Sequence, residues 1–101
     1  MNLSKVALTL LIMLPGFATL SAGDIAKGKA KSAVCAACHG ADGKAVIKTY
    51  PSLAGQNKEY LISSIKAYRD GQRNNPLMSP MSKGLTDEDI ANLAAYYSSL
   101  K

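Results

Sequence analysis

The sequence predicts an all-α domain built around a bound group, and three observations support this fold class. Residues 58–69 and 86–97 place apolar side chains at helical spacing. No stretch beyond residue 22 alternates apolar and polar side chains strictly enough to predict a half-buried strand. Beyond residue 22 the chain also has no Trp and no Phe. Its large apolar side chains are five Tyr and the aliphatic residues. We therefore expect helices and loops whose core is completed by something else.

The first 22 residues have the pattern of a secretory signal peptide. Lys5 precedes an apolar run from Val6 to Leu14, and small residues follow from Ala18 to Ala22. A membrane-spanning helix needs about 20 apolar residues, so this run is too short unless the leader stays uncleaved as an anchor. We expect cleavage after Ser21 or Ala22, export to the periplasm and one domain over residues 23–101.

The size and charge of that domain limit its function. Removing 22 of the 101 residues leaves 79, which is near the size at which a hydrophobic core needs a disulfide, a metal or a covalent cofactor in support. The net charge of +5 becomes +4 without Lys5, and the basic residues are dispersed. A nucleic-acid-binding protein would need a denser basic stripe. We expect no nucleic-acid partner.

The first helix should begin at Asp24, which is a suitable N-cap, and continue through Val34 into the cysteines. The next segment, residues 40–57, contains Gly43, Pro51 and Gly55, which all interrupt regular structure. We expect this loop to wrap around a bound group rather than to pair in a sheet.

A second helix is predicted over residues 58–69, because Leu61, Ile65 and Tyr68 share one face and Gly71 is a good stop signal. Residues 71–84 should be irregular, because Pro76 and Pro80 lack amide donors and restrict their predecessors.

The last helix should begin after Thr86 as N-cap, with three acidic residues in its first turn, where the helix dipole favours anions. Its apolar stripe consists of Ile90, Leu93, Ala94 and Tyr97.

Residues 35–39, Cys-Ala-Ala-Cys-His, carry the most specific chemical signal. On a helical turn, Cys35 and Cys38 can add across the two vinyl groups of one haem, and the imidazole of His39 is then held against the iron. A thioredoxin-like thiol pair or a disulfide is the alternative, but the predicted helices do not alternate with strands. A zinc site would lack a fourth ligand. The motif therefore predicts one covalent haem c.

Haem iron has two axial positions, and His39 is the only His of the chain, so it can fill one of them. The other could be taken by a Met thioether, a Lys amine, water or nothing. Met78 and Met81 are the only Met residues after the leader, and both lie on the proline-flanked segment. A thioether ligand stabilises ferrous iron and raises the reduction potential.

At this point the chain resembles the class I c-type cytochromes, and more closely one haem domain of the bacterial cytochrome c-four group. The ordered landmarks are Ala-Gly-Asp at 22–24, Cys-Ala-Ala-Cys-His-Gly at 35–40, Tyr-Pro-Ser-Leu-Ala-Gly-Gln at 50–56, Met-Ser-Pro-Met at 78–81 and Leu-Thr-Asp-Glu-Asp-Ile-Ala-Asn-Leu-Ala-Ala-Tyr-Tyr at 85–97. The resemblance implies the small class I fold wrapped around one haem. Cytochromes of the c-four group have two such domains, whereas this chain has one haem motif.

The resemblance also assigns roles to residues. The ligand Met of the family lies seven residues before the Leu that precedes the last helix, which implies Met78, with Met81 as the alternative. The carbonyl of Pro51 would bind the free ring nitrogen of His39. Leu53 and Ile65 would pack against the haem. Tyr96 or Tyr97 would cross the first helix near Gly28, where the missing side chain permits close approach.

The function implied is a one-electron shuttle without catalytic residues or a small-molecule substrate. By resemblance, its donor would be a quinol-oxidising complex and its acceptor a terminal oxidase or reductase, with membrane contact only through these partners. We expect a monomer. The alternatives are a haem enzyme or gas sensor with an open axial position, a haem-free thiol protein, and a subunit of a larger dehydrogenase.

Overall fold

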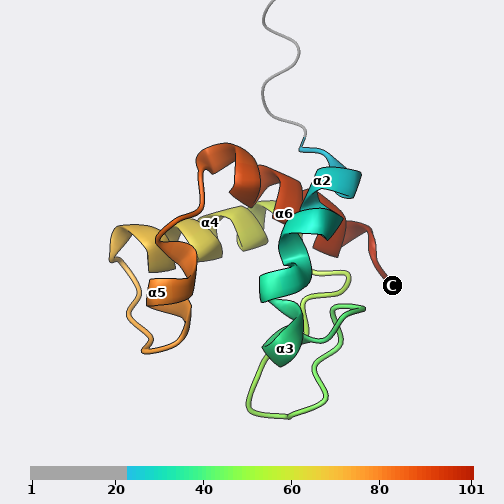
Figure 1. Ribbon diagram of the computed structural model, residues 1–101, viewed down its shortest axis with the longest axis horizontal. Coiled ribbons are helices and arrows are strands. Elements are labelled where there is room, and N and C mark those ends of the chain that lie inside the picture. Colours follow the sequence, from blue (N-terminus) through green and yellow to red (C-terminus); the bar gives the residue numbers. More distant parts are fainter. Residues whose placement is uncertain (1–22) are drawn as a thin grey trace, which may run out of the picture.

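The computed structural model describes residues 23–101, so the predicted signal peptide lies outside the described residues. The elements of this part, in chain order, are α2 Ile25–Lys31, the 3-10 turn η3 Ser32–Val34, α3 Ala36–His39, α4 Lys58–Asp70, α5 Met78–Ser82 and α6 Asp87–Ser99 (Figure 1). Residues 23–101 contain no strand, which confirms the predicted all-α class. Within the same range, every helix is too short or too polar to cross a membrane.

The predicted first helix is present but changes geometry before the cysteines. Its N-cap is Asp24, whose carboxylate accepts the Lys27 N–H at 2.9 Å. The α-helical turns end at Lys31, and the tighter η3 leads into α3. The buried face of α2 and η3 consists of two small residues, Gly28 and Ser32. A helix with so little apolar surface can pack only by close approach of its backbone.

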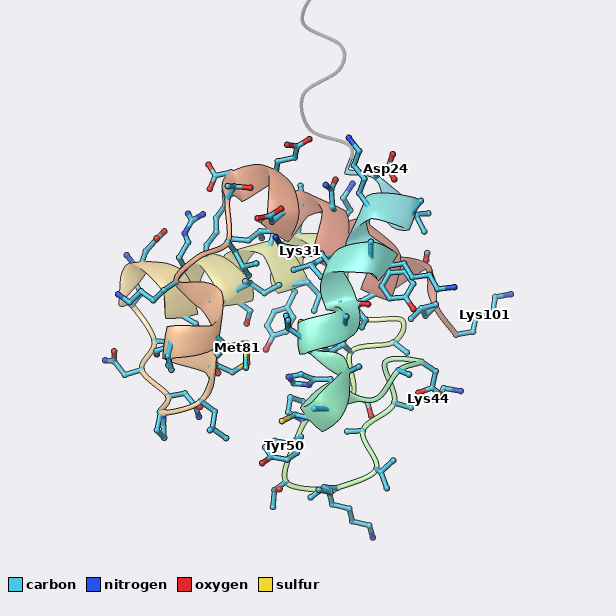
Figure 2. All side chains as sticks on the ribbon, in the orientation of Figure 1. Asp24, Lys31, Lys44, Tyr50, Met81 and Lys101 are labelled. Carbon is cyan, nitrogen blue, oxygen red and sulfur yellow. The ribbon has the colours of Figure 1, made fainter. Side chains whose placement is uncertain are left out.

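That close approach is made to α6. A Cβ at Gly28 would lie 2.8 Å from the Cβ of Tyr96 and closer still to the carbonyl of Asn92. The sequence predicted that either Tyr96 or Tyr97 lies at this crossing, and the structure places Tyr96 there. The side-chain oxygen of Asn92 also accepts the Asp24 N–H at 2.7 Å. At the other end of α2, Lys31 Nζ lies 3.5 Å from Asp89 Oδ2 (Figure 2).

Helices α4 and α6 pack together and form the core. The predicted stripe of α6 is fully buried, with Ile90, Leu93, Ala94 and Tyr97 each at most 2 % exposed. From α4 only Leu61 is buried, at 3 % exposed. Ile65 and Tyr68 are half-buried and line a cavity, so the apolar face of α4 is divided between core and cavity.

The prediction that residues 71–84 are irregular is wrong for Met78–Ser82, which form α5. Asn75 Oδ1 accepts the N–H groups of Leu77 and Met78 at 2.9 and 3.0 Å, which satisfies two backbone donors at the start of the helix. Pro80 falls within this first turn, where a backbone N–H has no partner inside the helix. The proline therefore removes no helical hydrogen bond, and a short helix can form.

The long loop at residues 40–57 passes below and to the right of α3 in Figure 1, and hydrogen bonds within the loop close it. The carbonyl of Gly43 accepts the N–H groups of Leu53 and Ala54 at 2.7 and 3.0 Å. Gly43 has a φ of +76°, which disfavours any residue with a side chain. The N–H of Gly55 donates to the Tyr97 carbonyl at 2.9 Å and ties the end of the loop to α6. Residues 50–54 are thereby held close to the cysteine turn, where the Pro51 carbonyl contacts His39.

Candidate functional site

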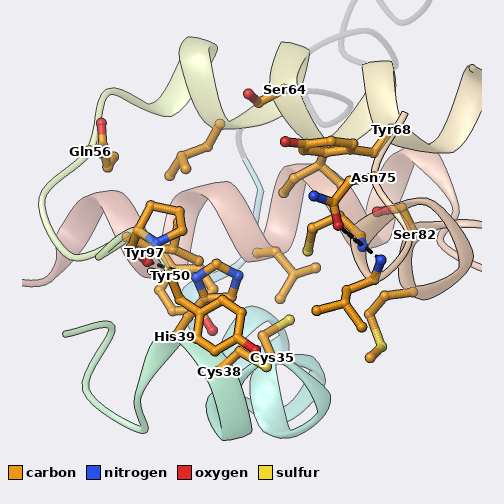
Figure 3. Close-up of a pocket in the computed structure, with 18 of the residues that line it drawn as sticks. Cys35, Cys38, His39, Tyr50, Gln56, Ser64, Tyr68, Asn75, Ser82 and Tyr97 are labelled. Carbon is orange, nitrogen blue, oxygen red and sulfur yellow. Dashed lines mark hydrogen bonds between the residues drawn. The ribbon is translucent and has the colours of Figure 1, made fainter. Parts of the chain in front are cut away.

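A cavity of about 290 Å³ lies between the cysteine turn, the loop, α4, α5 and α6 (Figure 3). Pockets that bind small molecules and cofactors are mostly apolar and have volumes of about 300–1,000 Å³, so this cavity is close to the size that suits a bound group. All of the residues predicted from the sequence to hold the cofactor line this cavity: Cys35, Cys38, His39, Pro51, Leu53 and Met78.

The cysteine turn presents its side chains to the cavity from one helical turn. The N–H groups of Cys38 and His39 donate to the Cys35 carbonyl at 3.3 and 2.9 Å. Gly40, with a φ of +87°, then ends α3. The two sulfur atoms and the imidazole therefore face one space from adjacent positions on a helical backbone (Figure 3). This is the arrangement that double attachment to one haem requires.

Cys35 and Cys38 do not form a disulfide with each other. Burial raises the pKa of the Cys35 thiol above its ordinary value. A redox-active Cys-x-x-Cys pair needs a lowered thiol pKa, because the thiolate is the nucleophile. The environment of Cys35 therefore disfavours the alternative of a thioredoxin-like site.

His39 is 7 % exposed, and its Nδ1 lies 2.8 Å from the carbonyl oxygen of Pro51. This is the contact that the family resemblance implied. Because a carbonyl only accepts, Nδ1 must carry the proton, and Nε2 is left with a free lone pair. A histidine with this tautomer and a fixed ring orientation is prepared to bind a metal ion through Nε2.

The two candidate thioethers come from α5, and both Met78 and Met81 line the cavity. Met78 is half-buried, whereas Met81 is 49 % exposed. Figure 2 shows Met81 on the side of α5 that faces the cysteine turn. A soft, neutral sulfur and an imidazole on the same cavity form a donor set suited to haem iron.

Sequence reasoning missed two hydroxyl groups on this cavity. Among the described residues, Ser82 Oγ and Tyr97 OH are the buried side-chain oxygen atoms without a hydrogen-bond partner. Burial, and secondarily the neighbouring Cys35, raises the pKa of the Tyr97 phenol, so this group stays protonated. Buried polar groups in proteins are nearly always paired. Ser82 belongs to the helix that was predicted to be irregular, so no pattern in the sequence pointed to it.

The donor set, the apolar lining and the unpaired hydroxyls together fit a large, mostly apolar group with an iron centre and a few polar edges. Most of the lining is contributed by apolar side chains such as Leu53, Leu61, Ile65, Leu85 and Leu93. Such a lining excludes water and gives the low dielectric in which a haem is normally held.

Comparison with known protein families gives one matching model, cytochrome c, over residues 25–101. Among curated proteins, the chain is 60 % identical to cytochrome c-554(548) of Halomonas halodenitrificans over 81 residues, which cover 77 % of this chain and 98 % of that protein. It is 45 % identical to cytochrome c4 of Pseudomonas aeruginosa over 101 residues, which cover 100 % of this chain and 50 % of that protein.

Among solved structures, the fold is similar to the crystal structure of reduced recombinant cytochrome c4 from Pseudomonas stutzeri. The TM-score is 0.75 at 38 % identity, and the match covers 79 % of this chain and 47 % of that one. The chain thus spans nearly all of the first relative and about half of the cytochromes c4.

Proposed function

The chain belongs to the cytochrome c family, and from this premise we propose that it is an exported monohaem carrier that shuttles single electrons through a His/Met-ligated haem. Family membership implies one covalent haem c, and Cys35 and Cys38 of the Cys-x-x-Cys-His motif are the residues that attach it. The observation that carries the proposal is a single cavity onto which both thiols, a buried imidazole and two thioethers open.

We assign the axial ligands to His39 and Met78. Support for His39 comes from its burial and from the hydrogen bond that leaves Nε2 free. Support for Met78 comes from its place on the cavity, its greater burial than Met81, and its position seven residues before Leu85. When bound, such a haem supplies reversible one-electron chemistry at an iron centre whose potential the thioether raises.

The residues around the cavity suit electron transfer better than catalysis. Two protein ligands leave no axial position for a substrate, and the apolar walls from α4 and α6 exclude water. Helix α4, which forms one wall of the cavity, is held in place because it packs on both α5 and α6. Little in this frame has to move when the oxidation state changes, which favours a carrier over an enzyme.

The proposed location is the periplasm, and the proposed partners are redox proteins. The leader pattern of residues 1–22 supports export. With the positive charge of Lys5 removed from the net +5, the domain retains +4, and lysines such as Lys44 and Lys101 project from the surface (Figure 2). Such charge would steer encounters with acidic patches on a quinol-oxidising donor and on an oxidase or reductase acceptor, through a small interface of under about 1,200 Å².

Spectroscopy of the purified exported protein tests this proposal. We expect a coloured, monomeric protein that is low-spin in both oxidation states, titrates reversibly with one electron and does not bind carbon monoxide rapidly. A five-coordinate ferrous form that binds carbon monoxide at once would instead indicate a haem enzyme or a gas sensor. A colourless protein from cells able to attach haem would indicate a thiol protein. Size-exclusion chromatography of native extract would reveal a larger dehydrogenase.

A further inference from the structure

Two neighbouring apolar side chains project into solvent from the tip of the long loop, which we define as residues 44–48 and call the loop tip. Val46 is 90 % exposed, the highest value among the large apolar side chains of residues 23–101, and Ile47 is 56 % exposed. Neither residue lines the cavity. A group bound in the cavity therefore leaves both of them in contact with water.

The other exposed apolar side chains of residues 23–101 have different surroundings. Four of them line the cavity and would contact a group bound there: Val34, Tyr60, Leu77 and Met81. The remaining one, Ile25, lies in the first turn of α2. Single exposed apolar side chains are common on protein surfaces. The adjacent pair Val46 and Ile47 is therefore the feature that indicates a binding partner.

The loop tip stands on a fixed base. The Ala45 N–H donates to Ser52 Oγ at 3.0 Å, and the Tyr50 N–H donates to the Ile47 carbonyl at 3.1 Å. The loop extends away from the helices, toward the bottom of Figure 1. Because the turn is formed in advance, the loop tip loses little conformational entropy when it binds a partner.

The charge of the loop tip is positive. Lys44 and Lys48 flank the apolar pair, and both are exposed. No Asp or Glu occurs between Asp42 and Glu59 in the sequence. Neither lysine forms an ion pair with a carboxylate of residues 23–101. A partner of the loop tip should therefore be anionic as well as able to accept apolar side chains.

The size and shape of the loop tip favour a lipid surface over a protein partner. A specific protein interface buries about 1,200–2,000 Å² of total surface and requires a matching surface on the partner. A short projecting loop supplies only a small part of that area. A bilayer needs no matching pocket, and lysines can keep their ammonium groups at the lipid phosphates while neighbouring apolar side chains lie deeper.

We propose that the loop tip binds membranes that contain anionic lipids, with Val46 and Ile47 at the boundary between headgroups and acyl chains and both lysines at the phosphates. The binding is weak and reversible, because even one long acyl chain gives only marginal attachment. This adds a direct contact to the partner-mediated membrane contact that the sequence predicted. The binding rests on the loop tip alone. Its use, which is to keep the carrier close to membrane redox complexes, rests on the proposed function.

Co-sedimentation of the exported holoprotein with lipid vesicles tests the proposal, once mass spectrometry has verified loss of the leader. We expect binding to vesicles of phosphatidylcholine and phosphatidylglycerol in equal parts, and much weaker binding to phosphatidylcholine alone or at high salt. Lys44→Gln and Lys48→Gln should each lower the partition coefficient about fivefold. The double variant Val46→Ser/Ile47→Ser should lower it about tenfold.

Matched controls come from α2, which lies at the opposite end of the molecule from the loop tip in Figure 1. Ile25→Ser removes an apolar side chain that is 53 % exposed, and Lys29→Gln removes an exposed charge. Each should change the partition coefficient by less than about twofold, because charges beyond a Debye length are screened and Ile25 does not reach the bilayer.

Three results would overturn the inference: a wild-type protein that does not sediment with the anionic vesicles, a double variant that sediments as the wild type does, or control variants that weaken binding equally. Loop-tip variants that bind vesicles normally but are reduced more slowly by a membrane extract would also overturn it, in favour of an acidic protein partner. If the double variant does not mature, Val46→Ser alone provides the readout, with about a threefold loss expected and no loss contradicting the proposal.

The absorption spectrum distinguishes failure of this inference from failure of the proposed function. Low-spin haem in a protein that does not bind anionic vesicles removes only the role of the loop tip. Vesicle binding that depends on Val46 and Ile47, in a protein without low-spin haem, supports the loop tip and removes the proposed function.

Discussion

The imidazole Nδ1 of His39 lies 2.8 Å from the carbonyl oxygen of Pro51, twelve residues further along the chain. The loop keeps this carbonyl in position through the hydrogen bonds to the Gly43 carbonyl and through Ser52 Oγ, which accepts the Ala45 N–H at 3.0 Å. The hydrogen bond to this loop carbonyl thus selects the tautomer of His39 in which Nδ1 is the donor. The free Nε2 is what makes His39 suitable as an iron ligand.

The crossing of α2 and α6 predicts that Gly28 cannot be enlarged. In Gly28→Ala, the new methyl group would meet the carbonyl of Asn92, so the helices would have to separate. We expect a loss of about 1–3 kcal/mol in the free energy of unfolding, measured by denaturant titration of the holoprotein. Gly84→Ala is the matched control, because nothing lies within 4 Å of its added Cβ. Equal stability of the two variants would contradict the packing described for α2.

The second prediction concerns the hydrogen bonds that cap the N-terminus of α6 and their contribution to the free energy of unfolding. Thr86 Oγ1 accepts the Asp89 N–H at 3.0 Å and Asp89 Oδ2 accepts the Thr86 N–H at 3.0 Å, which is a complete capping box. Thr86→Ala should lower the free energy of unfolding by about 1 kcal/mol, whereas Thr86→Ser should retain most of it. Thermal unfolding that gives the same midpoint for both variants would argue against a stabilising role of the cap.

The stabilising contribution of the capping box should depend on pH, because Asp89 is one of its two members. Its hydrogen bonds with Thr86, reinforced by the nearby Lys31, hold the pKa of the Asp89 carboxyl below its usual value. A depressed pKa in the folded state adds stability above the unfolded pKa of about 4, and this stability is lost as the pH falls through the folded pKa. Asp89→Asn should therefore be less stable than wild type at pH 7, by about 0.3–1 kcal/mol, with the difference shrinking below about pH 4. Glu88→Gln is the control for removal of a charge in the same turn.

The sequence predicted most of the fold, because helical periodicity and capping residues act locally. Asp24, Thr86 and Gly71 mark helix ends in the structure as their residue types implied. Helix α5 was missed because Pro76 and Pro80 were interpreted as helix breakers. In the structure, Asn75 binds the N–H groups at the start of α5, and Pro80 falls in its first turn. Position within a helix, and not residue type alone, decides what a proline does.

Only part of the candidate site could be predicted from the residues themselves. The cysteine motif identified its own chemistry, but the assignments of Pro51 and Met78 depended on family resemblance. The role of Asn92 could not be found from the sequence, because it arises from a contact between α6 and the start of α2, which are distant in the chain. Ser82 was missed because its burial depends on the packing of α5. The burial of Asn92 and Tyr96 follows from contact of α6 with two neighbours, which widens its buried face beyond the predicted stripe.

The ferric absorption spectrum of two methionine variants tests the central claim most directly. A Met thioether bound to ferric haem iron gives a weak band near the red edge of the visible range. We predict that this band is present in the wild type, disappears in Met78→Ala and persists in Met81→Ala. Persistence of the band in Met78→Ala together with its loss in Met81→Ala would show that the other thioether is the ligand. Its absence from the wild-type protein would contradict His/Met ligation altogether.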